Sequence, residues 1–155
     1  LAAATGVQPG AVNRLRQVHG AHVVALTNQG YPSAQRPLPE GDVLVSATPG
    51  AVLAVQGADC VPLLLADTRR GVAAAAHSGW RGMVLDVAGQ AVAALKERFG
   101  THPGDIVVAV GPAVGACCYE VGPEVRQAFA SAGHGAGILD RWFARHAVVD
   151  ACNPR

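Results

Sequence analysis

The chain has 155 residues, of which 50% are hydrophobic and 15% are charged, and its formal net charge is +1. This length fits one globular domain, and so much apolar content excludes an intrinsically disordered protein. Lys and Arg are scattered, so nothing indicates a surface for nucleic acid or an anionic membrane, and a small-molecule partner is expected. No apolar run approaches the roughly 18 residues of a membrane-spanning helix. Four cysteines without a disulfide framework, and no leader-like start, favour a cytoplasmic protein with reduced thiols.

The first half of the chain has the pattern of short strands interrupted by one long loop. Turn formers around Gly20 separate two strands predicted over residues 12–18 and 22–26, which leaves His19 at a strand end. Residues 27–42 are rich in Gly, Pro, Gln and Ser, as in the long loops that often border functional sites. Further strands are predicted over residues 43–46, 52–56, 61–66 and 72–76. These strands are almost continuously apolar, which indicates that both of their faces are covered.

A change of period follows His77. Apolar residues recur at helical spacing through residues 84–95, and Gly100 stands where a helix C-cap belongs. The sequence therefore predicts one helix over residues 80–99.

The last third of the chain continues the alternation of strands and helices. A buried strand is predicted over residues 106–110, and a second helix over residues 123–133, with Pro123 in its first turn and Glu124 favourable to the helix dipole. A short aromatic helix is expected after Gly135. This order predicts an α/β fold in which mixed β-sheets are layered with helices.

Two imidazoles and one thiol, each beside a chain-turning residue, form a candidate metal site: His19, Cys60 and His77. A catalytic zinc takes three protein ligands and leaves its fourth position for water or substrate. Each residue also has a simpler interpretation, because His19 could bond the backbone at a turn, Cys60 could be a small buried hydrophobe and His77 could cap a helix. Ligands of one zinc are expected to bring their donor atoms within about 4 Å of one another.

Two charged residues stand next to these candidate ligands. Arg81, at the start of the predicted helix, could hold phosphate with its forked guanidinium, or could merely pair with Asp86. Asp59 precedes Cys60 and could act as a general acid or base, or could orient a ligand histidine from behind.

Four ordered motifs resemble the laccase-domain family. They are Gln-Val-His-Gly at residues 17–20, the Ala-Asp-Cys-Val-Pro block at 58–67, His-Ser-Gly-Trp-Arg-Gly at 77–82, and Gly-Pro-Ala-Val-Gly with Cys-Tyr-Glu-Val-Gly at 111–122. That family was long labelled multicopper polyphenol oxidase and is now treated as zinc-containing purine nucleoside phosphorylase with adenosine deaminase activity. The resemblance implies a four-layer α/β/β/α fold. It also implies Zn²⁺, with Cu²⁺ as the alternative metal, on His19, Cys60 and His77.

The resemblance implies that adenosine or inosine reacts with phosphate to give a purine base and ribose 1-phosphate. Three alternatives stay open: a cysteine hydrolase with Cys60 as nucleophile and His77 as base, a polyphenol oxidase, and an inactive fragment. Six histidines without a His-x-His pair argue against a multicopper oxidase of the usual kind. The family's aromatic and arginine-rich C-terminal segment is missing. We therefore expect residues 1–155 to be one laccase-like domain that lacks N- and C-terminal parts of the full length.

Overall fold

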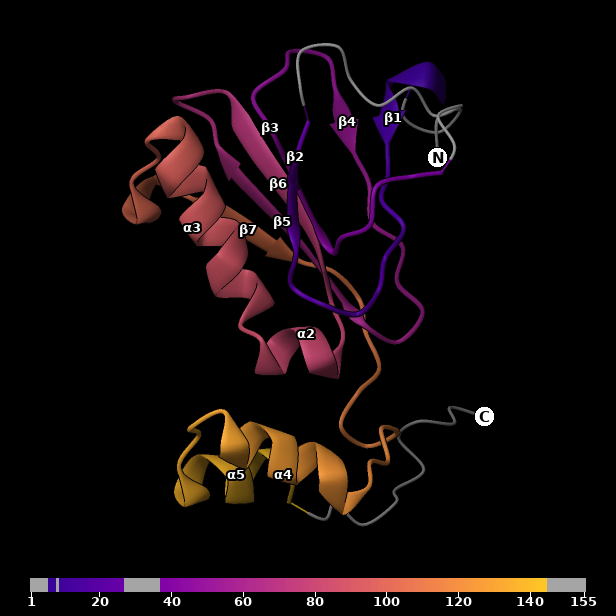
Figure 1. Ribbon diagram of the computed structural model, residues 1–155, viewed down its shortest axis with the longest axis vertical. Helices are drawn as coiled ribbons and strands as arrows, with labels where there is room; N and C mark the ends of the chain where they lie inside the picture. The colour runs from indigo at the N-terminus through magenta and orange to yellow at the C-terminus, as the bar shows by residue number, and fades with distance from the viewer. Residues whose placement is uncertain (1–5, 8, 27–36, 145–155) are drawn as a thin grey trace. The chain divides into compact units, whose positions relative to one another are not determined.

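The computed structural model describes residues 6–7, 9–26 and 37–144 (Figure 1). The chain divides into two compact units, residues 1–112 and 113–155. The first unit contains strands β1 to β7 and helices α2 and α3, and the second contains helices α4 and α5.

A mixed sheet forms the framework of the first unit. Its order is β2 (Val23–Ala25), β3 (Val43–Ser46), β6 (Val72–Ser78), β5 (Val61–Asp67) and β7 (Val107–Val110). The pair β2 and β3 is parallel, whereas the other three neighbouring pairs are antiparallel. The predicted mixed α/β class is therefore confirmed.

Helix α3 (Val87–Phe99) covers one face of this sheet, where it packs on β2, β3 and β6 (Figure 1). The buried side chains between the helix and the sheet are small, and include Val43, Val45, Ala74, Ala76, Ala91 and Leu95. Small side chains let the helix and the sheet approach closely, so a core of modest volume can still be packed without voids.

The other face of the sheet lies under a two-stranded parallel sheet of β1 (Val12–Asn13) and β4 (Val52–Leu53). Leu44 belongs to a core cluster on this side, while its neighbours on β3 belong to the cluster under α3. Successive side chains of a strand point to opposite faces, so β3 is buried on both of its faces, as its continuous apolar sequence predicts.

The hairpin of β5 and β6 sets the geometry of the candidate site. Val61 pairs with Ser78 and Pro62 pairs with His77. The prediction that the strand ends at residue 76 is thus wrong, because pairing with β5 carries β6 through Ser78. His77 consequently lies on a strand, beside the first residues of the strand that follows Cys60.

The single helix predicted over residues 80–99 is two helices, α2 (Trp80–Val84) and α3. Asp86 separates them, with a left-handed backbone at φ 55° and a carboxylate that accepts a hydrogen bond from the Gly89 N–H. Apolar spacing runs through this break and did not reveal it. The C-cap prediction is confirmed, since Gly100 is left-handed at φ 68°.

Several shorter predictions end differently in the structure. The strand predicted over residues 12–18 is only two residues long, because the chain turns around Asp42 at residues 18–20. The strand β7 is exposed along its whole length, so its predicted burial is wrong. Two short 3₁₀ turns, Pro9–Ala11 and Pro103–Asp105, complete the first unit. Residues 27–36 of the predicted loop, and the tail from residue 145, lie outside the described residues.

The second unit contains both predicted helices, α4 (Pro123–Ser131), which ends two residues before the predicted end, and α5 (Ala136–Trp142), and the two contact each other. Phe129 is buried and meets the Trp142 ring edge to face, with 5.8 Å between the ring centroids. Leu139 of α5 is also buried. The aromatic contact and three buried side chains, those of Val125, Phe129 and Leu139, hold this small unit together.

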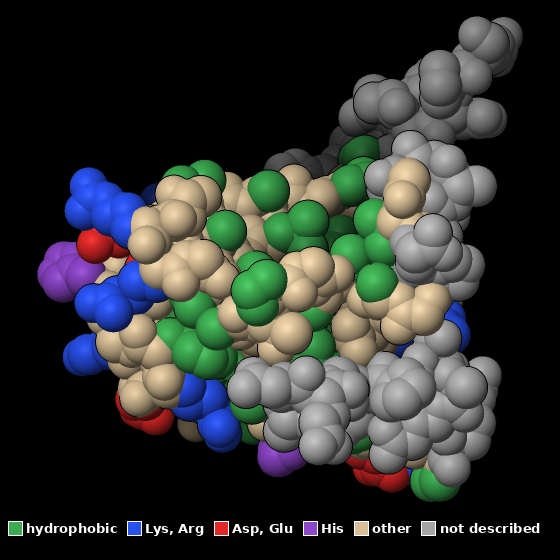
Figure 2. Space-filling model, turned by 90° about the horizontal axis from the view of Figure 1, so that it is seen from above, with side chains coloured by type: hydrophobic (Ala, Val, Ile, Leu, Met, Phe, Trp, Pro, Cys, Tyr) green, Lys and Arg blue, Asp and Glu red, His purple; other side chains and the backbone are tan. Residues whose placement is uncertain are grey.

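Positive and negative side chains lie near one another on the face seen in Figure 2. Lys and Arg lie mostly toward the left of this view with Asp and Glu beside them, and hydrophobic side chains lie over its middle, among other side chains and backbone. Arg69, for example, pairs with Asp105 at 3.0 Å. This face offers no continuous basic stripe of the kind that binds a phosphate backbone. In the described part of the chain, no helix is long and apolar enough to cross a bilayer.

The break between α2 and α3 predicts a site-specific stability effect at Asp86. Asp86→Ala removes the cap and puts an alanine in a left-handed conformation, so we expect a loss of about 1–3 kcal/mol in the free energy of unfolding. Asp86→Asn, which keeps a capping oxygen and tolerates this backbone, should cost less than about 0.5 kcal/mol. Urea unfolding followed by circular dichroism measures both; equal stability of Asp86→Ala and the parent chain would contradict this assignment.

Candidate metal centre

The structure brings together the three residues singled out in the sequence, His19, Cys60 and His77. Each offers one donor atom, and these atoms all lie within 4.8 Å of one another. The two imidazole rings meet edge to face, with 4.9 Å between centroids and an interplanar angle of 85°. This spread is a little wider than the about 4 Å expected for ligands already closed on zinc. Among the three candidate ligands His77 is buried, Cys60 is partly buried and His19 is exposed.

Each candidate ligand comes from a different kind of local structure. His19 lies in the turn between β1 and β2 and has a left-handed backbone, with φ at 59°. Cys60 is the residue before β5, and Asp59 just ahead of it is also left-handed, at φ 76°. His77 lies within β6. Two tight turns therefore bring a histidine and a cysteine to the edge of a rigid hairpin.

Asp42, which our sequence reasoning missed, contacts the residues of the candidate centre through its carboxylate. Its side chain is fully buried, at 0% exposure. One carboxylate oxygen, Oδ1, lies 2.9 Å from His77 Nδ1 and accepts from the His19 backbone N–H at 3.0 Å. The other, Oδ2, accepts from the N–H groups of Gly20 at 2.7 Å and Val18 at 3.2 Å. One carboxylate thus contacts two of the three candidate ligands.

The carboxylate also decides which nitrogen of His77 can bind a metal. A carboxylate only accepts hydrogen bonds, so Nδ1 of His77 must carry the proton that it shares with Asp42. The remaining nitrogen, Nε2, keeps its lone pair and is the atom that could bind a metal. The sequence shows only that Asp42 directly precedes the apolar residues 43–45; its partners at positions 18–20 and 77 are brought to it by the fold.

Of the two roles left open for Asp59, contact with a candidate ligand histidine is made instead by Asp42, whose carboxylate bonds His77. Asp59 is exposed, next to Cys60. It is left as the candidate general acid or base.

Arg81 is exposed on α2, and its guanidinium carbon lies 4.3 Å from the centroid of the Trp80 ring. Among the described residues it forms no ion pair with Asp86, whose carboxylate caps α3 instead. The guanidinium is therefore oriented by stacking on Trp80, and its positive charge is not paired with Asp86 and could bind an external anion.

Gly79 lies among all three candidate ligands. A Cβ at this position would come 3.1 Å from Cys60 Sγ, 3.1 Å from His19 Cδ2 and 3.9 Å from His77 Cε1. The backbone of Gly79 is extended, at φ −79°, so its conformation does not require glycine. Space among the donor atoms is what requires it.

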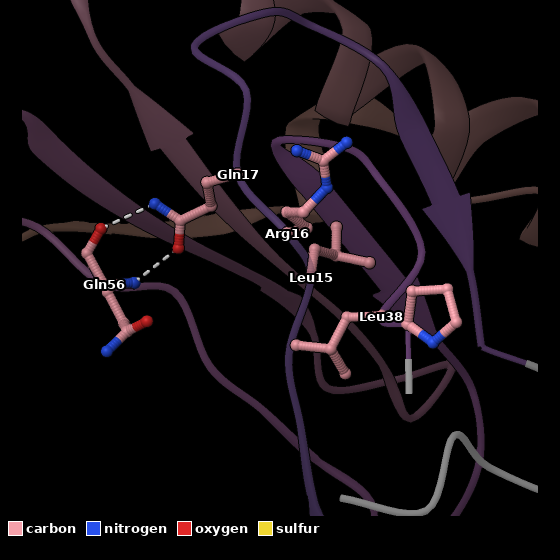
Figure 3. A pocket seen from close by; sticks show the side chains of 6 residues that line it. Leu15, Arg16, Gln17, Leu38 and Gln56 are labelled. Atoms are coloured by element: carbon pink, nitrogen blue, oxygen red, sulfur yellow. Dashed lines mark hydrogen bonds between the residues drawn. The ribbon is translucent and has the colours of Figure 1, made fainter. Parts of the chain in front are cut away.

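A side-chain amide links the turn that carries His19 to the segment that leads to Cys60. Gln17 Nε2 donates to the Gln56 carbonyl oxygen, and the Gln56 N–H donates to Gln17 Oε1, both at 2.7 Å (Figure 3). The Gln17 side-chain amide both donates to and accepts from the Gln56 backbone, as a paired strand would, and so continues the pairing of β1 and β4. The two glutamines border an open groove of about 510 Å³, whose other lining residues are Leu15, Arg16, Pro37 and Leu38.

The donor set fits a zinc ion. Two imidazole nitrogens and one thiolate are the borderline ligands that zinc prefers, and three of them leave a fourth position open. Copper accepts the same donors. No other group of three potential ligands occurs among the described residues, so they hold nothing that could house the additional coppers of a multicopper oxidase.

The contacts of Gly79 predict a steric block of the centre. Gly79→Ala should lower zinc affinity roughly tenfold, which matches the about 1–3 kcal/mol of an overpacked site. Gly10→Ala is the matched control, since a Cβ there meets nothing within 4 Å. Competition with a chromophoric chelator gives both affinities, and unchanged zinc binding by Gly79→Ala would show that the metal is not held among these three side chains.

Two curated relatives resemble most of this chain. The chain is 42% identical to a purine nucleoside phosphorylase of Deinococcus radiodurans, over 99% of this chain and 57% of the relative. It is 44% identical to a purine nucleoside phosphorylase of Streptomyces coelicolor, over 94% of this chain and 62% of the relative. The chain thus spans somewhat more than half the length of these curated relatives.

Solved structures share the fold. The crystal structure of YlmD from Geobacillus stearothermophilus matches with a TM-score of 0.78 at 32% identity, over 84% of this chain and 50% of that one. A hypothetical protein YfiH of Bacillus licheniformis matches with a TM-score of 0.81 at 28% identity, over 90% and 53%. The family model described as multi-copper polyphenol oxidoreductase laccase matches residues 1–150. The chain belongs to this laccase-like family.

Proposed function

We propose that this chain carries the zinc centre of a purine nucleoside phosphorylase, with His19, Cys60 and His77 as the ligands. The observation that carries the proposal is the convergence of three donor atoms around Gly79, with a buried carboxylate that leaves Nε2 of His77 free. The names of the curated relatives support the reaction class. The relatives are longer than this chain, so the activity proposed is that of the whole protein of which these residues form the metal-bearing part.

Phosphorolysis requires an anion site, an open face for the nucleoside and a proton for the departing base. Phosphate oxygen attacks C1 of the ribose, the bond from C1 to the purine nitrogen breaks, and the purine leaves with a proton. A bound zinc ion supplies Lewis-acid chemistry, because it polarises an oxygen in its open position. The protein groups must supply the rest.

Arg81 is the group that we assign to phosphate. Its guanidinium is exposed and stacked on Trp80, and it lies only two residues beyond Gly79, where a Cβ would meet all three candidate ligands. A guanidinium binds two phosphate oxygens at once, and so fixes the direction from which phosphate approaches the ribose. The helix α2 adds little, since it has only five residues.

Asp59 is the group that we assign to proton transfer. It is exposed next to Cys60, so it can reach a nucleoside beside the metal without being a ligand itself. In phosphorolysis it would deliver a proton to a ring nitrogen of the leaving purine. In the proposed deamination of adenosine, where water adds at C6 and ammonia leaves, the same carboxyl would move a proton from the water to the departing amino group.

A cysteine hydrolase is the second candidate, because Asp42, His77 and Cys60 also have the order of a carboxylate, a histidine base and a nucleophile. His19 argues for the metal, since a hydrolase triad has no use for a second imidazole within 4.8 Å of the thiol. The two functions differ in whether activity survives complete removal of metal.

Metal removal is the direct test of the proposed function. The purified protein should contain one zinc per chain, and chelation should abolish phosphate-dependent release of purine from inosine or adenosine until Zn²⁺ is restored. Cys60→Ser should lose the zinc together with the activity. Full activity in a metal-free sample, blocked by alkylation of Cys60, would establish the hydrolase instead.

Arg81 predicts a separate effect on phosphate. Loss of a charge-assisted hydrogen bond costs about 1.5–3 kcal/mol, so Arg81→Ala should raise the KM for phosphate by roughly 10–100-fold with an unchanged zinc content. Arg98→Ala, an exposed arginine in the last turn of α3, is the control and should leave that KM alone. Steady-state kinetics at varied phosphate distinguishes them, and equal KM values for both variants would remove Arg81 from the phosphate site.

A further inference from the structure

We propose that Asp42 is the positioning residue of the metal centre. Its carboxylate holds His77 in the required tautomer and His19 in the required backbone conformation before any ion arrives. The inference rests on the proposed function in one respect, since it takes His19, Cys60 and His77 to be metal ligands. It assigns to Asp42 a role that the ligands alone do not define.

The first support is the burial of the interaction with His77. Asp42 is 0% exposed and His77 is 3% exposed, so water cannot replace either partner of the 2.9 Å hydrogen bond. The backbone reinforces this bond, because the His77 N–H donates to the Asp42 carbonyl oxygen at 2.8 Å. Asp42 is therefore hydrogen-bonded to His77 through both its side chain and its main chain.

The second support is the turn that carries His19. Three consecutive N–H groups, those of Val18, His19 and Gly20, point at the Asp42 carboxylate. Such a concave run of amides binds an anion, and requires the left-handed φ of 59° that His19 adopts. A non-glycine residue disfavours that conformation, so the turn depends on the carboxylate to hold it.

An asparagine at position 42 cannot satisfy all four donors. If its NH₂ group replaced Oδ1, His77 would have to accept at Nδ1 and carry its proton on Nε2, which removes the ligand lone pair. If the NH₂ group replaced Oδ2, it would face the N–H groups of Gly20 and Val18 and open the turn beside His19. Either orientation disables one histidine, although the size of the side chain is unchanged.

The chain offers a matched control in Asp67. This residue is also buried, at 1% exposure, and its Oδ1 accepts from the backbone N–H groups of Arg69 and Arg70. It lies at the far end of β5 from Cys60. Asp67→Asn therefore reproduces the loss of a buried carboxylate without touching the candidate ligands.

The test measures Zn²⁺ and Co²⁺ affinity of the full chain by competition with a chromophoric chelator. Asp42→Asn should bind each ion roughly 10–100-fold more weakly than the parent chain, as removal of an outer partner of a ligand histidine does in zinc enzymes. Asp67→Asn should bind within about threefold of the parent. The absorption bands of bound Co²⁺ should also change in Asp42→Asn, because one histidine is disabled.

The outcomes separate the inference from the proposed function. Parent-like affinity of Asp42→Asn, or an equal loss in Asp42→Asn and Asp67→Asn, would overturn the positioning role while the zinc centre stands. Failure of the parent chain to bind either ion would overturn the proposed centre and the inference with it.

A measurement on the parent chain covers the case in which Asp42→Asn does not fold. Nitrogen-15 NMR of the metal-free protein, with the His77 signals identified by their loss in His77→Gln, should show the proton on Nδ1 and none on Nε2. A protonated Nε2 with a bare Nδ1 would contradict the proposed hydrogen bond to Asp42.

Discussion

Four N–H groups converge on one buried carboxylate, and the candidate centre depends on that convergence. The oxygens of Asp42 receive the Nδ1 proton of His77 and three successive backbone amides from the turn of His19. A buried carboxylate is tolerated only when its lone pairs are satisfied, so the turn and the strand are each required by the other. The same contacts that stabilise the fold also prepare two ligands, which links local structure directly to chemistry.

Small residues keep the centre compact. A Cβ at Gly82 would come 2.8 Å from the Gly20 carbonyl oxygen, and a Cβ at Gly79 would intrude among the three ligands. At Gly82, the backbone of helix α2 therefore lies close to the backbone of Gly20 in the turn of His19. The alanine-rich β6 likewise permits a close approach of α3 to the sheet. Rigid, closely packed supports of this kind limit the freedom of the ligands that they carry.

The sequence was most informative where local signals agree with the fold. Continuous apolar runs predicted β3, β5 and β6, and the glycine cap ended α3 at Gly100. Apolar spacing did not reveal the break at Asp86, because Val84 and Val87 keep helical spacing on either side of it. The burial predicted for β7 was wrong, since a valine-rich strand is apolar whether or not another element covers it.

The residues of the candidate site also differ in how far the sequence alone could identify them. His19, Cys60 and His77 could be named from residue type and from the motifs around them, and the structure brings their donor atoms together. Asp42 could not be assigned from its own neighbours, because its partners lie 22 to 35 positions away in the chain. Pairwise contacts at that separation are produced by the fold as a whole. Asp59, adjacent to Cys60 in the sequence, is exposed, whereas the carboxylate bonded to His77 is that of Asp42.

The central claim is that one zinc ion binds two imidazoles and one thiolate in this chain. X-ray absorption spectroscopy at the zinc edge of the loaded protein tests it most directly. A zinc ion held by His19, Cys60 and His77 should show one sulfur at about 2.3 Å, two imidazole nitrogens at about 2.0–2.1 Å and one further light atom in the open position. A first shell without sulfur, or one with several sulfurs, would contradict it.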